Sequence, residues 1–153
     1  EVKIEVPLDA TLPPDYVTRE DLRLEAYRRL ATVRSAAEVD DIRAEWLDRY
    51  GPPPERAEAL LAVARLRAEC HRTGVREVVV QKGPGFGGPK WVAKLGPLAL
   101  PESKKIRLAR LYKESVYKAE PQQLQLPLRV MKAEVVDALV AALTDLVPPE
   151  AAA

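Results

Sequence analysis

The segment SAAEVDDIRAEWLDRYG, residues 35–51, carries the clearest structural signal in this chain. Ser35 followed by Glu38 is a capping box, the pattern that begins an α-helix, and Gly51 stands where a helix commonly ends. Between them, four apolar residues recur at helical spacing: Val39, Ile42, Trp46 and Tyr50. The segment therefore predicts an amphipathic helix with one side packed on a core.

The opposite side of this helix carries three carboxylates. At 100° per residue, Asp41, Glu45 and Asp48 lie within roughly 60° of one another, almost opposite the core side. Arg49 lies at the edge of this stripe, four residues after Glu45, where we expect it to neutralise Glu45 in part. The stripe is either a solvated face or a docking surface for a basic partner, whose arginines can donate paired hydrogen bonds to carboxylates.

Two further helices and a strand are predicted around this segment. One helix runs from Thr18, its predicted cap, to about Val33, with Leu24 and Tyr27 giving it a second packed side. The other begins near Pro54 and stops at Gly74. Residues 2–6 alternate apolar and charged side chains, which predicts a short, half-buried strand.

Beyond residue 74 the sequence changes from helical to mixed patterns. The predicted strands are 75–80, 91–95, 116–119 and 124–128, and the predicted helices are 101–113 and 134–146. This order indicates an α+β fold, with an N-terminal three-helix unit packed with a small, mostly antiparallel sheet and two further helices. We expect one domain over 1–153, mainly helical over 1–74, mixed over 75–147, with a frayed tail at 148–153.

The composition excludes several classes of protein. The 153 residues include 24 Lys and Arg against 23 Asp and Glu, although residues 1–50 carry a net charge of −4 and the remainder +5. Near neutrality argues against a dedicated nucleic-acid binder. One Cys and one His permit neither an internal disulfide nor an all-Cys/His zinc site, and no apolar run is long enough to span a bilayer. We therefore expect a soluble, cytosolic module. Because the chain begins with Glu1, we also expect it to be a piece excised from a longer protein.

No pattern in the chain predicts catalysis. Gly83, Gly85 and Gly88 match G-x-G-x-x-G, but a strand rather than a helix follows them, so a hairpin loop is predicted in place of a phosphate site. Cys70 and His71 are neighbours on a helix and point about 100° apart, so they do not form a catalytic pair. We therefore expect no enzyme site and no cofactor in this chain.

The predicted helix at 101–113 is strongly basic. Its cations are Lys104, Lys105, Arg107, Arg110 and Lys113. The interpretation we favour is a solvated face with Ile106, Leu108 and Leu111 packed beneath it, because no aromatic residues interleave with the cations. The alternative is a nucleic-acid-binding accessory domain that uses residues 104–113.

Several motifs over about residues 1–80 resemble the TRCF domain, the C-terminal domain of the bacterial transcription-repair coupling factors (Mfd). The motifs are LPPDYV at 12–17, RLEAYRRL at 23–30, EWLDRYG at 45–51 with Pro54, and ARLR at 64–67. Tyr50 stands where the family usually has Phe, which keeps an aromatic ring. Beyond Gly74 the resemblance is one of general pattern, and the loop at 83–89 is read as an insertion.

The resemblance implies a regulatory role inside a longer protein. Members of this family are ATP-driven DNA translocases that displace stalled RNA polymerase and recruit excision repair through a UvrB-like domain that binds UvrA. The resemblance implies that this domain docks on the UvrB-like domain of its own chain, masks UvrA binding and restrains the motor. Glu45 and Asp48 match the family's acidic contact motif, and we add Asp41 and Arg49 as candidate contacts.

The same resemblance sets the remaining expectations. ATP and Mg would belong to the motor of the parent chain, and UvrA and RNA polymerase would be reached only indirectly. The resemblance also implies a location in the bacterial cytoplasm. From the charge balance and the absence of a long apolar run, and not from the resemblance, we expect no direct contact with DNA and no membrane partner.

Overall fold

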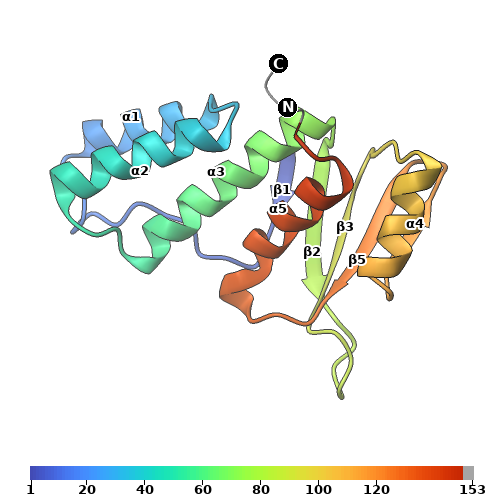
Figure 1. Cartoon of the computed structure of the whole chain (residues 1–153). Coiled ribbons are helices and arrows are strands. Elements are labelled where there is room, and N and C mark those ends of the chain that lie inside the picture. The colour runs from blue at the N-terminus through green and yellow to red at the C-terminus, as the bar shows by residue number, and fades with distance from the viewer. Residues whose placement is uncertain (150–153) are drawn as a thin grey trace. The chain divides into compact units, whose positions relative to one another are not determined.

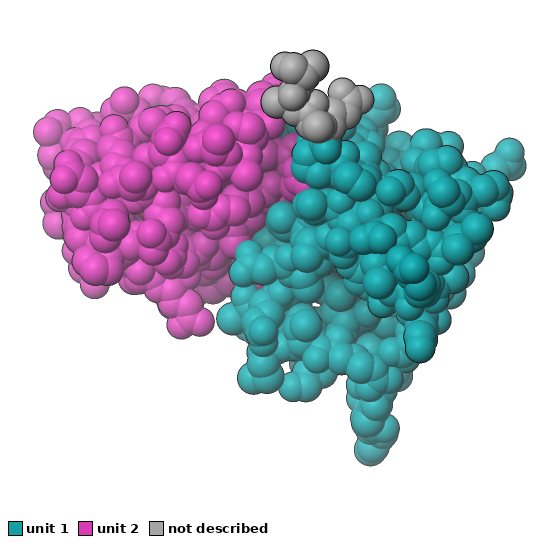
Figure 2. All heavy atoms as spheres, viewed as in Figure 1, with its two compact units in different colours: residues 1–7, 70–153 teal, residues 8–69 magenta. Residues whose placement is uncertain are grey.

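The computed structural model describes residues 1–149 and divides the chain into two compact units (Figures 1 and 2). Unit 1 comprises residues 1–7 and 70–153, and unit 2 comprises residues 8–69. Of the tail predicted at 148–153, residues 150–153 lie outside the described residues. The boundary between the units falls within the third helix, and each unit has its own buried residues.

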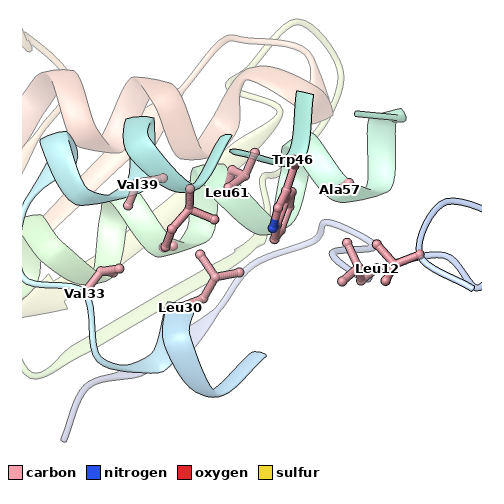
Figure 3. Packing of buried hydrophobic residues seen from close by; sticks show 10 residues of the cluster. Leu12, Leu30, Val33, Val39, Trp46, Ala57 and Leu61 are labelled. Carbon is pink, nitrogen blue, oxygen red and sulfur yellow. The ribbon is translucent and has the colours of Figure 1, made fainter. Parts of the chain in front are cut away.

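Unit 2 is built from three helices: α1 (Glu20–Ala31), α2 (Ala36–Tyr50) and the part of α3 (Glu55–Thr73) up to Glu69. Its core is a cluster of buried apolar residues, drawn in Figure 3: Leu12, Val17, Leu30, Val33, Val39, Ile42, Trp46, Ala57, Leu61 and Ala64. The cluster takes residues from all three helices and from the segment that precedes them, so the proline-containing segment 8–19 is part of the core rather than a loose connector.

The ends of α2 and α3 confirm the predictions made from capping residues. The Ser35 hydroxyl oxygen accepts a hydrogen bond from the Glu38 N–H at 3.2 Å, which starts α2. Gly51 (φ +86°) and Gly74 (φ +84°) end α2 and α3 in the left-handed region that favours glycine.

The prediction for α1 was wrong in two respects. Its N-cap is Arg19 and not Thr18, and the guanidinium of Arg19 forms an ion pair with Asp21 at 2.6 Å. Leu24 is 48% exposed and Tyr27 38% exposed, so the second apolar side of α1 is not packed. The Tyr27 hydroxyl instead accepts a hydrogen bond from the Leu12 N–H at 2.8 Å.

Unit 1 contains a five-stranded sheet in the order β1-β2-β3-β5-β4. The strands are β1 (Lys3–Glu5), β2 (Glu77–Lys82), β3 (Trp91–Gly96), β4 (Val116–Lys118) and β5 (Gln123–Leu128). The β1–β2 pair is parallel and the other pairs are antiparallel. One face of the sheet is buried, because alternate residues in register are apolar and inaccessible: Val78, Val80, Ala93, Leu95, Leu124, Leu126 and Leu128.

Two helices complete unit 1: α4 (Glu102–Leu111) and α5 (Val135–Leu146), the latter preceded by a 3₁₀ turn, η1 (Lys132–Glu134). α5 buries one apolar side, and its end is tied to the end of α4 by a hydrogen bond from the Tyr112 hydroxyl to Asp145 at 2.6 Å. Together the two units confirm the predicted α+β class, with three N-terminal helices, a mixed but mostly antiparallel sheet and two further helices.

The strand β1 joins the sheet of unit 1 although α1, α2 and most of α3 follow it in the sequence. Ile4 pairs with Val78 in the parallel register, and the Lys3 N–H donates to the Arg76 carbonyl at 2.9 Å. Residues 3–5 thus belong with the sheet and not with the helical unit. Within residues 1–149, no helix combines the length and the hydrophobicity that a bilayer crossing requires.

Candidate docking surface on the helical unit

The apolar residues of α2 are buried, as their helical spacing in the sequence predicts. Val39, Ile42 and Trp46 are at most 3% exposed, and Tyr50 is half-buried. Tyr16 packs edge-on against both aromatic rings, at 6.5 Å from Trp46 and 5.6 Å from Tyr50, and its hydroxyl donates to the Gly51 carbonyl at 2.8 Å. Burial raises the pKa of Tyr16, and the charge of Glu58 adds to that effect. The last turns of α2 are therefore held in a fixed position.

Ion pairs with α3 also fix α2. The Arg43 guanidinium donates to both carboxylate oxygens of Glu58, at 2.9 and 2.8 Å, and Arg65 lies 3.2 Å from Asp40. The hydrogen bonds from Arg43 hold the pKa of Glu58 below 4.5, although partial burial acts in the opposite direction. These contacts use side chains that flank the acidic stripe and leave the stripe itself available.

Two of the three carboxylates in the stripe are exposed and have no ion-pair partner within residues 1–149. These are Asp41 and Asp48. Glu45 is half-buried, and its carboxylate accepts a hydrogen bond from the Arg29 guanidinium of α1. The structure thus brings Asp41, Glu45 and Asp48 to the outer side of one helix, and pairs one of them with the neighbouring helix.

Arg49 does not neutralise Glu45 as we expected. Its guanidinium carbon lies 5.2 Å from the centre of the Tyr50 ring, a cation–π contact, and the cation within ion-pair distance of Glu45 belongs to Arg29. Spacing along one helix could not reveal Arg29, because Arg29 and Glu45 lie on different helices, 16 positions apart in sequence. Arg29 lies within the RLEAYRRL motif, but that motif carries no information about its partner.

A groove of about 70 Å³ opens beside these charges, between α1 and α2. Ten residues line it: Val17, Leu22, Glu25, Ala26, Arg29, Ile42, Glu45, Trp46, Arg49 and Tyr50. Pockets for cofactors and drug-sized ligands usually measure about 300–1,000 Å³, so this groove suits a single side chain of a partner. Its lining combines an aromatic wall with charges of both signs, the composition of a protein contact.

The basic helix α4 is less completely solvated than its charge suggests. Lys105 pairs with Glu102 at 3.1 Å, and Arg107 lies 3.8 Å from Asp145. Of the three apolar residues that we expected beneath the charges, Leu108 is buried, but Ile106 is 68% exposed and Leu111 45% exposed. That expectation was wrong for Ile106 and Leu111, because α4 turns only a narrow strip of its surface towards the rest of unit 1.

The structure also shows where the glycine loop and the Cys70–His71 pair lie. Residues 83–90 connect β2 to β3, so no helix follows the glycines, and the predicted hairpin loop is confirmed. Cys70 is buried and His71 is exposed, and the two lie on successive positions of α3. Among residues 1–149 no cluster of three or more His, Cys, Asp or Glu side chains has the geometry to hold a metal ion.

Fold and surface together define a class: a small α+β domain with a charged groove between two of its helices. The chain belongs to the TRCF domain family, whose family model matches residues 6–87. It is 42% identical over 128 residues to the transcription-repair-coupling factor of Mycobacterium tuberculosis, which covers 84% of this chain and 10% of that protein. It is 32% identical over 78 residues to the Escherichia coli factor, covering 51% of this chain and 7% of that protein.

A solved structure shares the fold. The crystal structure of the C-terminal domain of a transcription-repair coupling factor superposes with a TM-score of 0.76, covering 95% of this chain and 91% of that domain at 13% identity. The chain thus spans about a tenth of the length of its curated relatives and almost the whole of this solved domain.

Proposed function

We propose that this chain is a regulatory docking domain of a transcription-repair-coupling factor. Its acidic stripe binds basic residues on the UvrB-like domain of the same, longer protein. When docked, it masks the surface through which that domain binds UvrA and restrains the ATP-driven translocase. On this proposal the domain catalyses no reaction itself, and ATP and Mg belong to the motor of the longer protein.

The observation that carries the proposal is the pair of exposed carboxylates, Asp41 and Asp48, which have no ion-pair partner within residues 1–149 and lie beside a groove with an aromatic wall. Like charges on one helix face repel each other, and a basic partner relieves that repulsion. The contact would steer association and would weaken as salt increases. About nine tenths of each curated relative lies outside the part that this chain matches, which leaves ample length for an intramolecular partner.

The Glu45–Arg29 pair gives the surface a way to exchange partners. Both side chains are more than 40% exposed, and exposed ion pairs contribute only about 0–1 kcal/mol to stability. An arginine of the partner can therefore replace Arg29 at Glu45 with little loss to the domain. A contact of this kind is polar and reversible, as a regulatory contact between domains of one chain requires.

The test is a charge reversal in the full-length protein that contains this domain. Glu45→Arg with Asp48→Arg should leave the helical content unchanged but raise the ATPase rate and the affinity for UvrA. The matched control is Glu20→Arg with Glu55→Arg, which changes the net charge equally on exposed residues that lie outside both the stripe and the groove. The control should behave as wild type. Equal ATPase rates and equal UvrA affinities in all three proteins would contradict the assignment.

A second candidate function, nucleic-acid binding by α4, has one observation in its favour. Arg110 and Lys113 are exposed, and neither has an ion-pair partner within residues 1–149. A titration of the chain with duplex DNA at several salt concentrations separates the two functions. Binding near physiological salt that Arg110→Glu with Lys113→Glu abolishes would favour the second function over the first.

A further inference from the structure

The loop between β2 and β3 extends beyond the end of the sheet (Figure 1) and forms a narrow projection from unit 1 (Figure 2). At its base Lys82 is in register with Trp91, and the Gly83 N–H donates to the Lys90 carbonyl at 2.8 Å. At the middle of the loop, Phe86 is completely exposed. No other aromatic side chain among residues 1–149 stands so far into solvent.

The shape of this loop is specified by its residues. A Cβ at Gly83 would lie 1.9 Å from the Pro89 carbonyl oxygen, so the two arms of the loop approach as closely as only glycine allows. The Arg129 guanidinium donates to the Gly87 carbonyl at 2.8 Å, and Arg129 is itself held by two hydrogen bonds to Glu114. The loop is therefore tied to the segment that follows β5.

The backbone conformation and the exposure of Phe86 both carry a free-energy cost in the isolated chain. Its φ is +50°, a left-handed conformation that bulky residues rarely adopt, and its ring gains nothing from burial. Strain of this kind persists where the surroundings impose it, and it is concentrated at functional sites. The combination points to a contact made by the ring outside this chain.

Cations surround the base of the projection. Lys82, Lys90 and Lys132 are exposed, and none of them has a carboxylate within 4 Å among residues 1–149. The Lys90 ammonium lies 3.5 Å from the sulfur of Met131, the residue that precedes Lys132. The segment that carries Lys132 is therefore close to the base of the loop. A partner that meets Phe86 therefore also meets several unpaired positive charges.

Single-stranded nucleic acid is the partner that fits both features. Phe86 is completely exposed and its two neighbours are glycines without side chains, so both faces of the ring are clear for a base. A bilayer would reward a broader apolar patch, which the flanking glycines do not provide. An apolar protein pocket would accept the ring but would not use the lysines beside it. We propose that Phe86 stacks on an unpaired base while Lys82, Lys90 and Lys132 neutralise neighbouring phosphates.

This proposal departs from our expectation of no direct contact with DNA. That expectation followed from the near-neutral total charge and from the absence of aromatic residues among the cations at 104–113. The structure brings an aromatic ring and unpaired lysines together at a different place, far from α4 in sequence. The inference is independent of the α2 surface, since the hairpin belongs to the other unit.

The experiment measures fluorescence anisotropy of fluorescein-labelled 12-nucleotide dT and rU strands titrated with the 153-residue chain at 50 mM salt. Phe86→Ala should weaken binding about tenfold, since stacking on one aromatic side chain is worth roughly that factor. Phe86→Trp should bind as wild type, and Phe86→Leu should bind as weakly as Phe86→Ala because it is apolar but not planar. Three phosphate contacts predict a slope of log affinity against log salt of about −2.

The controls separate this site from others. Arg110→Glu with Lys113→Glu on α4 should leave binding unchanged, whereas Lys82→Glu with Lys90→Glu should weaken it. Circular dichroism checks that each variant is folded. No binding by the wild type, wild-type binding by Phe86→Leu, or equal binding of a blunt duplex with no effect of Phe86→Ala would each overturn the proposal. Binding to phosphatidylserine vesicles without binding to either strand would overturn it as well.

Discussion

The acidic surface of α2 and the hairpin between β2 and β3 are built in opposite ways. The carboxylates of α2 stand on a helix that is capped at both ends and fixed by a buried Trp46. The lysines and the ring of the hairpin stand on a loop whose shape depends on close backbone contacts at glycine. A total of 24 cations against 23 anions therefore conceals two surfaces of opposite sign, one in each unit.

The largest expected effect comes from removing the buried support of the acidic surface. Trp46→Ala should lower the free energy of unfolding by about 3–5 kcal/mol, because Trp46 is 3% exposed and borders the groove. Urea denaturation followed by circular dichroism measures this loss. Leu24→Ala, at a residue that is 48% exposed, is the control and should change stability by less than about 0.5 kcal/mol. Equal effects of the two changes would contradict the described core.

The hairpin should respond to a smaller change, the addition of one methyl group. Gly83→Ala places a Cβ 1.9 Å from the Pro89 carbonyl oxygen, so the backbone must shift, at a cost of about 1–3 kcal/mol. Gly85→Ala meets no atom within 4 Å and costs about 1 kcal/mol through its φ of +80° alone. Hydrogen exchange of the β2 and β3 amides should therefore accelerate more in Gly83→Ala. The reverse order would show that the arms are not in close contact.

The Arg43–Glu58 pair makes the support of α2 dependent on pH. Because Arg43 holds the pKa of Glu58 below 4.5, the ionised pair stabilises the fold at neutral pH, and this contribution disappears as the pH falls through the lowered pKa. Glu58→Gln should be less stable than wild type at pH 7, and the difference should shrink below pH 4.5. Thermal denaturation at a series of pH values measures it. A difference that stays constant with pH would contradict the role of the pair.

The smallest effect on stability is expected at the Glu45–Arg29 pair. Arg29→Ala should lower stability by at most about 1 kcal/mol, since both side chains are partly exposed. It should nevertheless speed association with a basic partner, because Glu45 is then unpaired. Arg28→Ala removes the same charge from the neighbouring, exposed position and is the control. Stopped-flow kinetics should show a larger increase in the association rate for Arg29→Ala than for Arg28→Ala. Equal association rates would mean that only the net charge of the domain matters.

Local sequence patterns predicted much of this fold, but they could not predict the pairings between residues far apart in the sequence. Ser35, Gly51 and Gly74 mark helix ends through bonds to nearby residues, so their roles are visible in the sequence. The parallel pairing of β1 with β2 joins residues more than 70 positions apart, and nothing in the run 2–6 identifies its partner strand. The α+β class was predictable from the order of elements, whereas the boundary between the units was not.

The candidate site was likewise predictable only in part. Helical spacing placed Asp41, Glu45 and Asp48 on one outward side, and the family resemblance drew attention to two of them. The pairing of Glu45 with Arg29 and the exposure of Ile106 depend on how helices pack, which amphipathic patterns describe poorly. The loop at 83–89 was predicted as a hairpin, but its sequence pattern did not predict the left-handed backbone of Phe86 or the hydrogen bond from Arg129 to Gly87.

The most direct test of the docking surface is the binding of this chain to an isolated UvrB-like domain, the partner that we propose for it. Isothermal titration calorimetry should detect binding by the wild type that weakens with salt. Glu45→Arg with Asp48→Arg should lower the affinity at least tenfold, and Glu20→Arg with Glu55→Arg should leave it unchanged. Binding that is the same for all three proteins, or no binding by the wild type, would contradict the account.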